Sequence, residues 1–280
     1  MKRILVLAIV ASMSVVSAVE ASPIIVQGVG DLAAITLIRD SFRTAVGGGI
    51  VAGANGSFGG VRREINWDGV PDMFAAPNLL PPNFFNVNSP RGVVFSTPGT
   101  GFEVSANAGA AAPIEYGNIN ATYPSTFETF SAQRLFTALG STVTDVSFFV
   151  PGTTTPALTS AFGAIFTDVD LAGSSIQYFD AMNNSLGVFA VPFLLGSGTF
   201  SFLGVVFDSP IVSRVRIISG NTALGPTDNP GIGIDVAVMD DFIYGEPTAA
   251  AVPEPTSLLL LGTGVLGLIA KLRSRKRQRS

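Results

Sequence analysis

The 280-residue chain contains no histidine and no cysteine, and these two absences remove several kinds of chemistry. No Ser-His-Asp or Cys-His nucleophile system can be built, and no disulfide or His/Cys-ligated zinc or haem site can form. Charged residues make up only 13% of the chain, and tryptophan occurs once. Any chemistry that remains must rest on carboxylates, arginines and hydroxyl groups.

Lysine is also missing from the long central part of the chain. Residues 22–270 contain 8 arginines, 19 acidic residues and no lysine, which gives this body a net charge of about −11. Such a body repels nucleic acids and anionic membrane surfaces, and it attracts divalent cations. We therefore expect no nucleic-acid partner.

Glycine, proline and phenylalanine are abundant, at 31, 18 and 21 residues, and 47% of the chain is apolar. This composition can bury a sizeable core and favours short strands joined by tight turns. Strand-like segments cover residues 143–150, 161–169, 175–180, 186–193, 199–207, 211–218 and 232–244. Their number and spacing predict an all-β fold, a two-sheet antiparallel sandwich of jelly-roll or immunoglobulin-like type.

Residues 22–95 are less regular than the rest of the body. A helix is predicted over residues 31–46, with Asp31 as its N-cap and Gly47-Gly48-Gly49 as its end. A Gly/Asn/Ser-rich loop and a proline-broken coil follow, so we expect this part to be largely irregular. It is assigned to the same exported domain, residues 22–251.

The N-terminus has the three parts of a secretory signal peptide. Lys2 and Arg3 precede an apolar stretch over residues 4–16, and small residues follow at the cleavage region. Val19-Glu20-Ala21 fits a cut before Ser22, and Val16-Ser17-Ala18 is the alternative. We expect residues 1–21 to be removed on export.

The C-terminus combines a proline motif, an apolar run and a basic tail. Val252, Pro253, Glu254 and Pro255 precede an apolar run over residues 257–270, which is followed by a Lys/Arg cluster. As a helix, 14 residues rise only about 21 Å, so the predicted transmembrane helix is extended to residues 256–272. The basic tail would stay in the cytoplasm, leaving the body outside.

These three elements in this order resemble the PEP-CTERM sorting signal of exported proteins in Gram-negative bacteria. The resemblance covers residues 252–280 and implies export through the Sec translocon, transient anchoring in the inner membrane, and processing by an exosortase near Pro253-Glu254-Pro255. It also implies an association with extracellular polysaccharide and biofilm matrix. The alternative is a plain single-pass tail anchor whose prolines are incidental.

The only tryptophan suggests one candidate binding site. Arg62, Arg63, Glu64 and Asp68 flank Trp67, and an aromatic platform beside charged groups is typical of sugar-binding clefts. The structural alternative is a tryptophan that fills the end of the sandwich, with Arg–Asp pairs holding a long loop.

Two aspartate pairs suggest a calcium site. Asp168 and Asp170 lie two residues apart at a strand end, and Asp240 shares the inward phase of Val238 and Phe242, beside Asp241. A carboxylate that faces the core must be paired, and oxygen-only ligands suit Ca²⁺. An Arg–Asp ion pair, or a β-bulge that turns Asp240 outward, would explain the same pattern.

The same carboxylates could in principle hydrolyse a glycan, but no aromatic-rich segment surrounds them, and we expect no enzyme activity. The sequence thus predicts a structural or adhesive component of the extracellular polysaccharide layer at the cell surface. A carbohydrate-binding module with structural Ca²⁺ is the alternative, and a glycan hydrolase is the least favoured.

Overall fold

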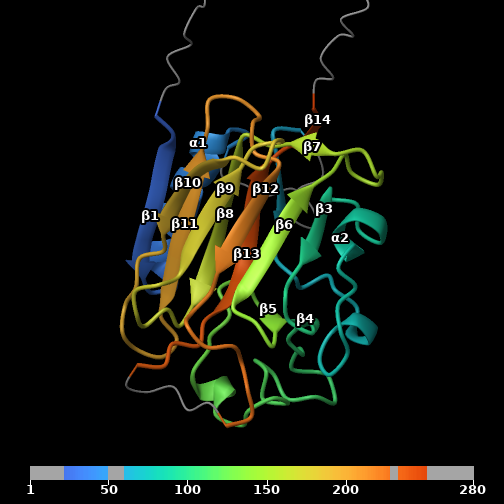
Figure 1. Cartoon of the computed structure of the whole chain (residues 1–280). Coiled ribbons are helices and arrows are strands. Elements are labelled where there is room, and N and C mark those ends of the chain that lie inside the picture. Colours follow the sequence, from blue (N-terminus) through green and yellow to red (C-terminus); the bar gives the residue numbers. More distant parts are fainter. Residues whose placement is uncertain (1–21, 50–59, 228–232, 251–280) are drawn as a thin grey trace, which may run out of the picture.

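Two antiparallel sheets stacked face to face form the body, and helix α1 covers the outside of the larger sheet (Figure 1). The computed structural model describes residues 22–49, 60–227 and 233–250. The larger sheet contains β1 (Ile24–Gly30), β2 (Arg62–Ile65), β4 (Gly101–Val104), β5 (Phe136–Leu139), β8 (Ala161–Thr167), β11 (Phe200–Val206) and β13 (Val238–Gly245). The smaller contains β3 (Val93–Ser96), β6 (Val143–Phe148), β9 (Ser175–Phe179), β10 (Ser185–Ala190) and β12 (Arg214–Ile218).

The remaining elements of the described chain are short strands and helices, apart from α1. A small two-stranded sheet pairs β7 (Ala157–Leu158) with β14 (Thr248–Ala249). The helical elements are α1 (Leu32–Val46), α2 (Phe84–Val87) and the two 3₁₀ turns η1 (Asp72–Phe74) and η2 (Tyr123–Ser125). In Figure 1, β1 begins and β14 ends at the same end of the sandwich.

The order of the strands identifies the type of sandwich. The larger sheet runs β1-β11-β8-β13-β5-β4, with β2 also paired to β13, and the smaller runs β10-β9-β12-β6-β3. Eight strands form the jelly-roll core, and they can be renumbered 1 to 8 in chain order: β5, β6, β8, β9, β10, β11, β12 and β13. In these numbers β5-β13-β8-β11 of the larger sheet is 1-8-3-6, and β6-β12-β9-β10 of the smaller sheet is 2-7-4-5. This is the order of a jelly roll, in which two Greek keys are wrapped into one sandwich.

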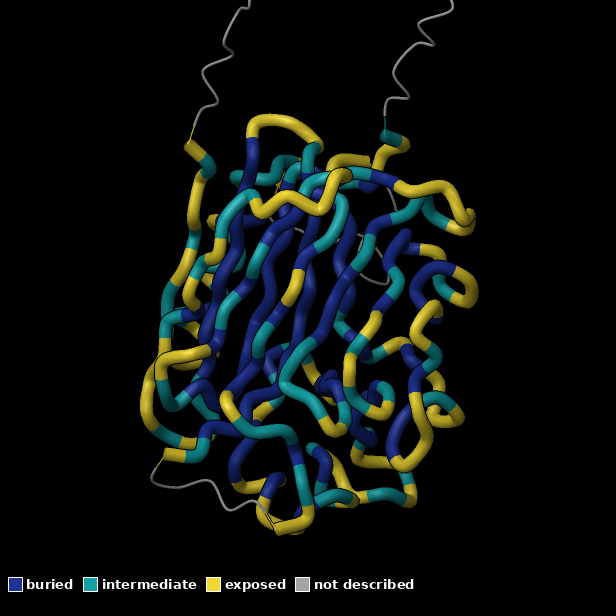
Figure 2. The backbone as a smooth tube through the Cα atoms, in the orientation of Figure 1, coloured by how far each residue is buried: buried dark blue, intermediate teal, exposed yellow. Residues whose placement is uncertain are grey.

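Two apolar layers lie on the two sides of the larger sheet. The main core fills the space between the sheets, and Figure 2 shows buried residues concentrated along the central strands. The second layer lies under α1, where Phe42 packs against Phe202 with ring centroids 5.3 Å apart. A Cβ atom at Gly204 would lie 2.5 Å from the Phe42 ring, and one at Gly163 would lie 2.9 Å away. These two glycines therefore allow the helix to sit close to the sheet.

The sandwich and the helix agree with the sequence prediction. Asp31 caps α1 by accepting a hydrogen bond from the Ala34 N–H at 2.9 Å, and the helix ends at Gly47. Residues 22–95 are more regular than predicted, because β1 and β2 are strands of the larger sheet and α1 packs on it. The strand predicted over residues 232–244 corresponds to β13, which begins at Val238.

The targeting segments are not covered by these observations. The predicted signal peptide (residues 1–21), the Val252-Pro253-Glu254-Pro255 motif and the predicted membrane helix (residues 256–272) lie outside the described residues. Within the residues that are described, no helix is both long enough and apolar enough to cross a bilayer.

Candidate functional site

Trp67 is part of the core and not of a binding surface. Its side chain is buried, and its ring stacks on Phe136 at a centroid distance of 4.0 Å and an interplanar angle of 2°. Phe85 and Phe242 contact it edge-on, and its Nε1 donates a hydrogen bond to the backbone oxygen of Asp240 at 2.7 Å. The predicted sugar platform at Trp67 is therefore wrong, because no face of the ring is open to solvent.

The neighbouring arginines are also used inside the protein. Arg62 donates from Nε to Glu64 Oε1 at 2.7 Å and from Nη1 to the backbone oxygen of Gly47 at 2.6 Å. Arg63 donates from Nη2 to Glu246 Oε1 at 2.8 Å. Arg62, Arg63 and Trp67 are buried and Asp68 is partly buried, so the predicted set does not form an exposed ligand-binding surface.

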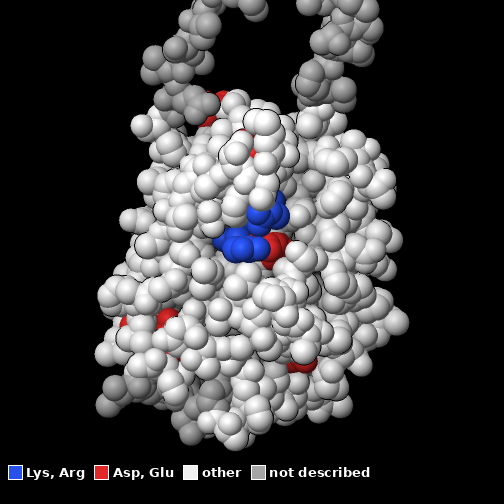
Figure 3. Space-filling view, in the orientation of Figure 1, with Lys and Arg blue, Asp and Glu red and all other residues white. Residues whose placement is uncertain are grey.

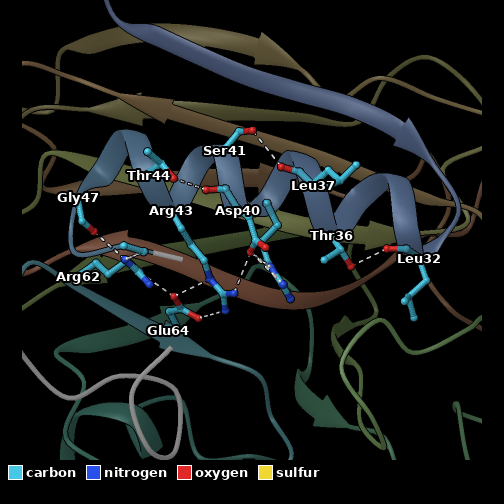
Figure 4. A network of polar contacts seen from close by, with 12 residues as sticks. Leu32, Thr36, Leu37, Asp40, Ser41, Arg43, Thr44, Gly47, Arg62 and Glu64 are labelled. Carbon is cyan, nitrogen blue, oxygen red and sulfur yellow. Dashed lines mark hydrogen bonds and ion pairs between the residues drawn. The ribbon is translucent and has the colours of Figure 1, made fainter. Parts of the chain in front are cut away.

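Glu64 is the centre of a buried ion-pair network that sequence reasoning did not single out. Figure 4 shows its carboxylate below α1, between two guanidinium groups. Arg43 donates to it from the helix at 2.9 Å, and Arg62 donates from the same strand, β2. Asp40 accepts a further hydrogen bond from Arg43 at 3.1 Å. The network connects α1 to the larger sheet.

Asp240 and Asp241 lie in a β-bulge of β13. Met239 pairs with Phe166 and Phe242 with Ala164, so Asp240 and Asp241 lie opposite a single residue of β8. The bulge changes the phase of the strand: Met239 and Phe242 belong to the core between the sheets, while Asp240 bonds to the loop at residues 130–131. Asp240 is fully buried, as expected, but it does not share a face with Phe242.

The Asp240 carboxylate fastens that loop to the sheet. Its Oδ2 accepts from the Phe130 N–H at 2.7 Å, and its Oδ1 accepts from Ser131 Oγ at 2.8 Å. Burial raises the pKa of Asp240 well above its usual range, and the adjacent Asp241 carboxyl raises it further. Because Asp240 and Asp241 are buried, a polysaccharide has no access to either carboxyl group.

Asp68 belongs to the same group of carboxyls. Burial, followed by the charge of Asp241, raises the pKa of Asp68 to about 6. Asp68 Oδ1 and Asp241 Oδ1 are buried and have no hydrogen-bond partner among the described residues. Ser131 and Arg134, which also surround these carboxyls, were not predicted, because they lie more than 60 residues from Asp68 or Asp240 in sequence.

Asp168 and Asp170 form a second, separate acidic group, with Asp235. Strand β8 ends at Thr167, and Asp168 adopts a left-handed backbone with a φ of 65°. The buried Asp168 Oδ1 has no hydrogen-bond partner in the described part of the chain. Burial, then the charges of Asp170 and Asp235, raises the pKa of Asp168 to about 8.

The four aspartates do not form one ligand set. Among the described residues, no group of three or more acidic side chains is arranged to hold a metal ion. The predicted set separates into Asp168 and Asp170 at one place and Asp240 and Asp241 at another. Both carboxylate oxygens of Asp240 accept hydrogen bonds from the protein, whereas Asp168 Oδ1 accepts none from the described residues. Calcium binding stays a prediction, and Asp168 is its better candidate.

Asp168→Asn should make the fold less sensitive to pH. The raised pKa means that the folded protein prefers the neutral acid, so the contribution of Asp168 to stability falls as pH rises from about 4 through about 8. Asparagine is neutral and tolerates a positive φ. We expect the variant to be more stable at pH 8 by about 1–3 kcal/mol, with little change at pH 4.

Urea unfolding at pH 4 and pH 8 measures this difference. The matched control is Asp180→Asn, because Asp180 is exposed and its hydrogen bonds with Asn184 lower its pKa. If the wild type and Asp168→Asn lost the same amount of stability between pH 4 and pH 8, the raised pKa of Asp168 would be contradicted.

Comparison with known proteins gives one specific result. Residues 251–276 match the PEP-CTERM protein-sorting motif, so the chain carries a jelly-roll body followed by this sorting motif. No curated protein matches the sequence. Among solved structures, the enzymatically active domain of tailspike protein 4 from bacteriophage CBA120 is similar at 12% identity and a TM-score of 0.23. The match covers 60% of this chain and only 20% of the tailspike chain, which is too little to establish a shared fold.

Proposed function

We propose that this protein is a structural or adhesive component of the extracellular polysaccharide layer. The observation that carries the proposal is the PEP-CTERM motif at residues 251–276, which implies exosortase-dependent sorting to the cell envelope or surface. The motif follows a domain in which three of the four candidate carboxylates, Asp168, Asp240 and Asp241, are buried, and this favours a role in binding and assembly over catalysis. We accordingly expect no release of reducing sugar from a matrix polysaccharide.

The route to the surface follows from the two terminal segments. Residues 1–21 would direct the chain to the Sec translocon, and residues 256–272 would hold it in the inner membrane until an exosortase acts near Pro253-Glu254-Pro255. The body would then remain outside the cytoplasm, in contact with extracellular polysaccharide.

Removing residues 253–280 should yield soluble secreted protein, because the remaining acidic body keeps its export signal and loses the proposed anchor. Fractionation of cells, membranes and medium measures the outcome. The matched control replaces Pro253 and Pro255 by alanine and keeps the apolar run; it should stay with the membranes unprocessed. Recovery of the truncated protein in the membrane pellet would exclude anchoring by this segment.

A carbohydrate-binding module with structural Ca²⁺ is the second candidate. The buried and unpartnered Asp168 Oδ1, close to the charges of Asp170 and Asp235, favours it. If Ca²⁺ binds there, it should raise the melting temperature of the wild type and not that of Asp168→Asn. An equal response to Ca²⁺ in both proteins, or in neither, would remove Asp168 as a ligand.

A further inference from the structure

Among the described residues, positive charge is most exposed at Arg216 and its neighbour Arg214. All eight basic residues between residues 22 and 270 are arginines, and all lie in the described part of the chain. The side chains of Arg216 and Arg214 are 44% and 21% exposed, whereas Arg39, the next most exposed arginine in an ion pair, is at 17%. Figure 3 shows one basic patch near the centre of this face, with an acidic group beside it and a few scattered acidic groups elsewhere.

The two arginines are held rigidly on the outer face of the smaller sheet. They lie two residues apart on β12, so they project from the same face, opposite to the buried Val215. The Arg214 guanidinium lies over the Phe179 ring, 3.8 Å from its centroid, and donates to Asn183 Oδ1 at 2.6 Å. Because these contacts fix the side chain, little conformational entropy is lost when it binds a ligand.

One aspartate is shared by both arginines. Asp145 on β6 lies opposite Arg216 in the sheet and accepts from its Nε at 2.9 Å and from its Nη2 at 2.8 Å. Arg214 donates to the same carboxylate at 2.6 Å. Two guanidinium groups on one carboxylate leave one net positive charge. Arg216 Nη1 donates to no other described residue, so it is available to a ligand.

The surroundings of this spot are uncharged and suited to a sugar chain. On one side of Arg216, Gln177 of β9 is its partner in the sheet, and Val188 of β10 is the partner of Gln177. On the other side, Asp145 is followed by its own partner, Ser96 of β3. These side chains offer amide and hydroxyl groups for hydrogen bonds and an apolar surface for sugar rings.

We infer that the outer face of the smaller sheet binds a polysaccharide that carries uronic-acid units, with Arg214 and Arg216 recognising the sugar carboxylate. The single net positive charge matches a monoanionic carboxylate better than a dianionic phosphate, and guanidinium groups pair with carboxylates in a bidentate manner. The inference rests on the proposed function, since it names the kind of polysaccharide that the exported protein would contact.

Isothermal titration with trigalacturonate and with its methyl ester tests the inference on the exported protein purified from cells. The ester keeps every sugar ring and replaces each carboxylate by a neutral methyl ester. We expect the acid to bind and the ester to bind at least about tenfold more weakly, and raising the salt concentration should reduce the difference. Arg216→Gln should weaken binding of the acid by about tenfold, and Arg216→Lys should restore part of it.

The matched control is Arg39→Gln, which removes the same charge from α1, on the far side of the larger sheet. It should bind trigalacturonate like the wild type. Equal binding of acid and ester, unchanged binding by Arg216→Gln, equal loss in both variants, or displacement by equimolar inorganic phosphate would each overturn the inference. Retention of the protein in the matrix fraction of intact cells is measured separately, so the proposed function can survive a negative titration.

Discussion

Trp67→Ala is expected to lower the free energy of unfolding by about 3–5 kcal/mol, enough to leave much of the protein unfolded at 37 °C. Trp67 is the largest of the fully buried side chains, and it stacks on Phe136 with edge contacts from two further phenylalanines. Alanine would remove these contacts and leave a cavity between the two sheets. Urea unfolding followed by far-ultraviolet circular dichroism measures the loss.

Trp67→Phe is the matched control for that experiment. It keeps an aromatic ring against Phe136 but removes the Nε1 donor, so the backbone oxygen of Asp240 in the bulge loses its partner. A cost of about 1–3 kcal/mol is expected. A sugar-binding role would give the reverse pattern, with intact stability and lost binding in Trp67→Ala.

Glu64→Gln should cost about 3–5 kcal/mol, because it leaves the guanidinium groups of Arg43 and Arg62 buried beside a neutral amide. Both arginine side chains are less than a tenth exposed, so water cannot replace the lost carboxylate. Since the network connects α1 to the larger sheet, the substitution should also increase the rate of amide hydrogen exchange in α1 more than in β9 and β12.

Asp40→Asn is the control for the network. Asp40 pairs with the same Arg43, but its side chain is 23% exposed. Its loss should cost less than about 1 kcal/mol, as is usual for ion pairs near solvent. If the two variants were equally stable, the burial of Glu64 would not be the source of its effect.

The strand pattern was readable from the sequence because alternation and turns are local. Within the predicted segment 211–218, Val215 and Ile217 are buried and Arg214 and Arg216 face outward, as alternation requires, and the Asp31 cap of α1 was predicted correctly. The choice between a jelly roll and an immunoglobulin-like sandwich was not readable. It depends on which strands pair, and β5 and β13 are about 100 residues apart.

The candidate sites failed for a related reason. Trp67 follows Ile65 by two residues and belongs to the same core, so its ring is buried by the packing of the two sheets, which the local sequence does not reveal. The bulge at Asp240 shifts the phase of β13 by one residue. No glycine or proline marks this bulge within Val238–Tyr244. Partners such as Ser131 and Glu246 are brought in by tertiary folding alone.

The position of the last strand has a consequence for the fate of the domain. Tyr244 is the last residue along the described chain that belongs to the main core. The two residues of β14 that follow are exposed and pair only with β7. A peptide bond broken past residue 250 would sever no contact of the described core. If an exosortase cleaves the chain there, as the proposed function requires, the domain needs no refolding after cleavage.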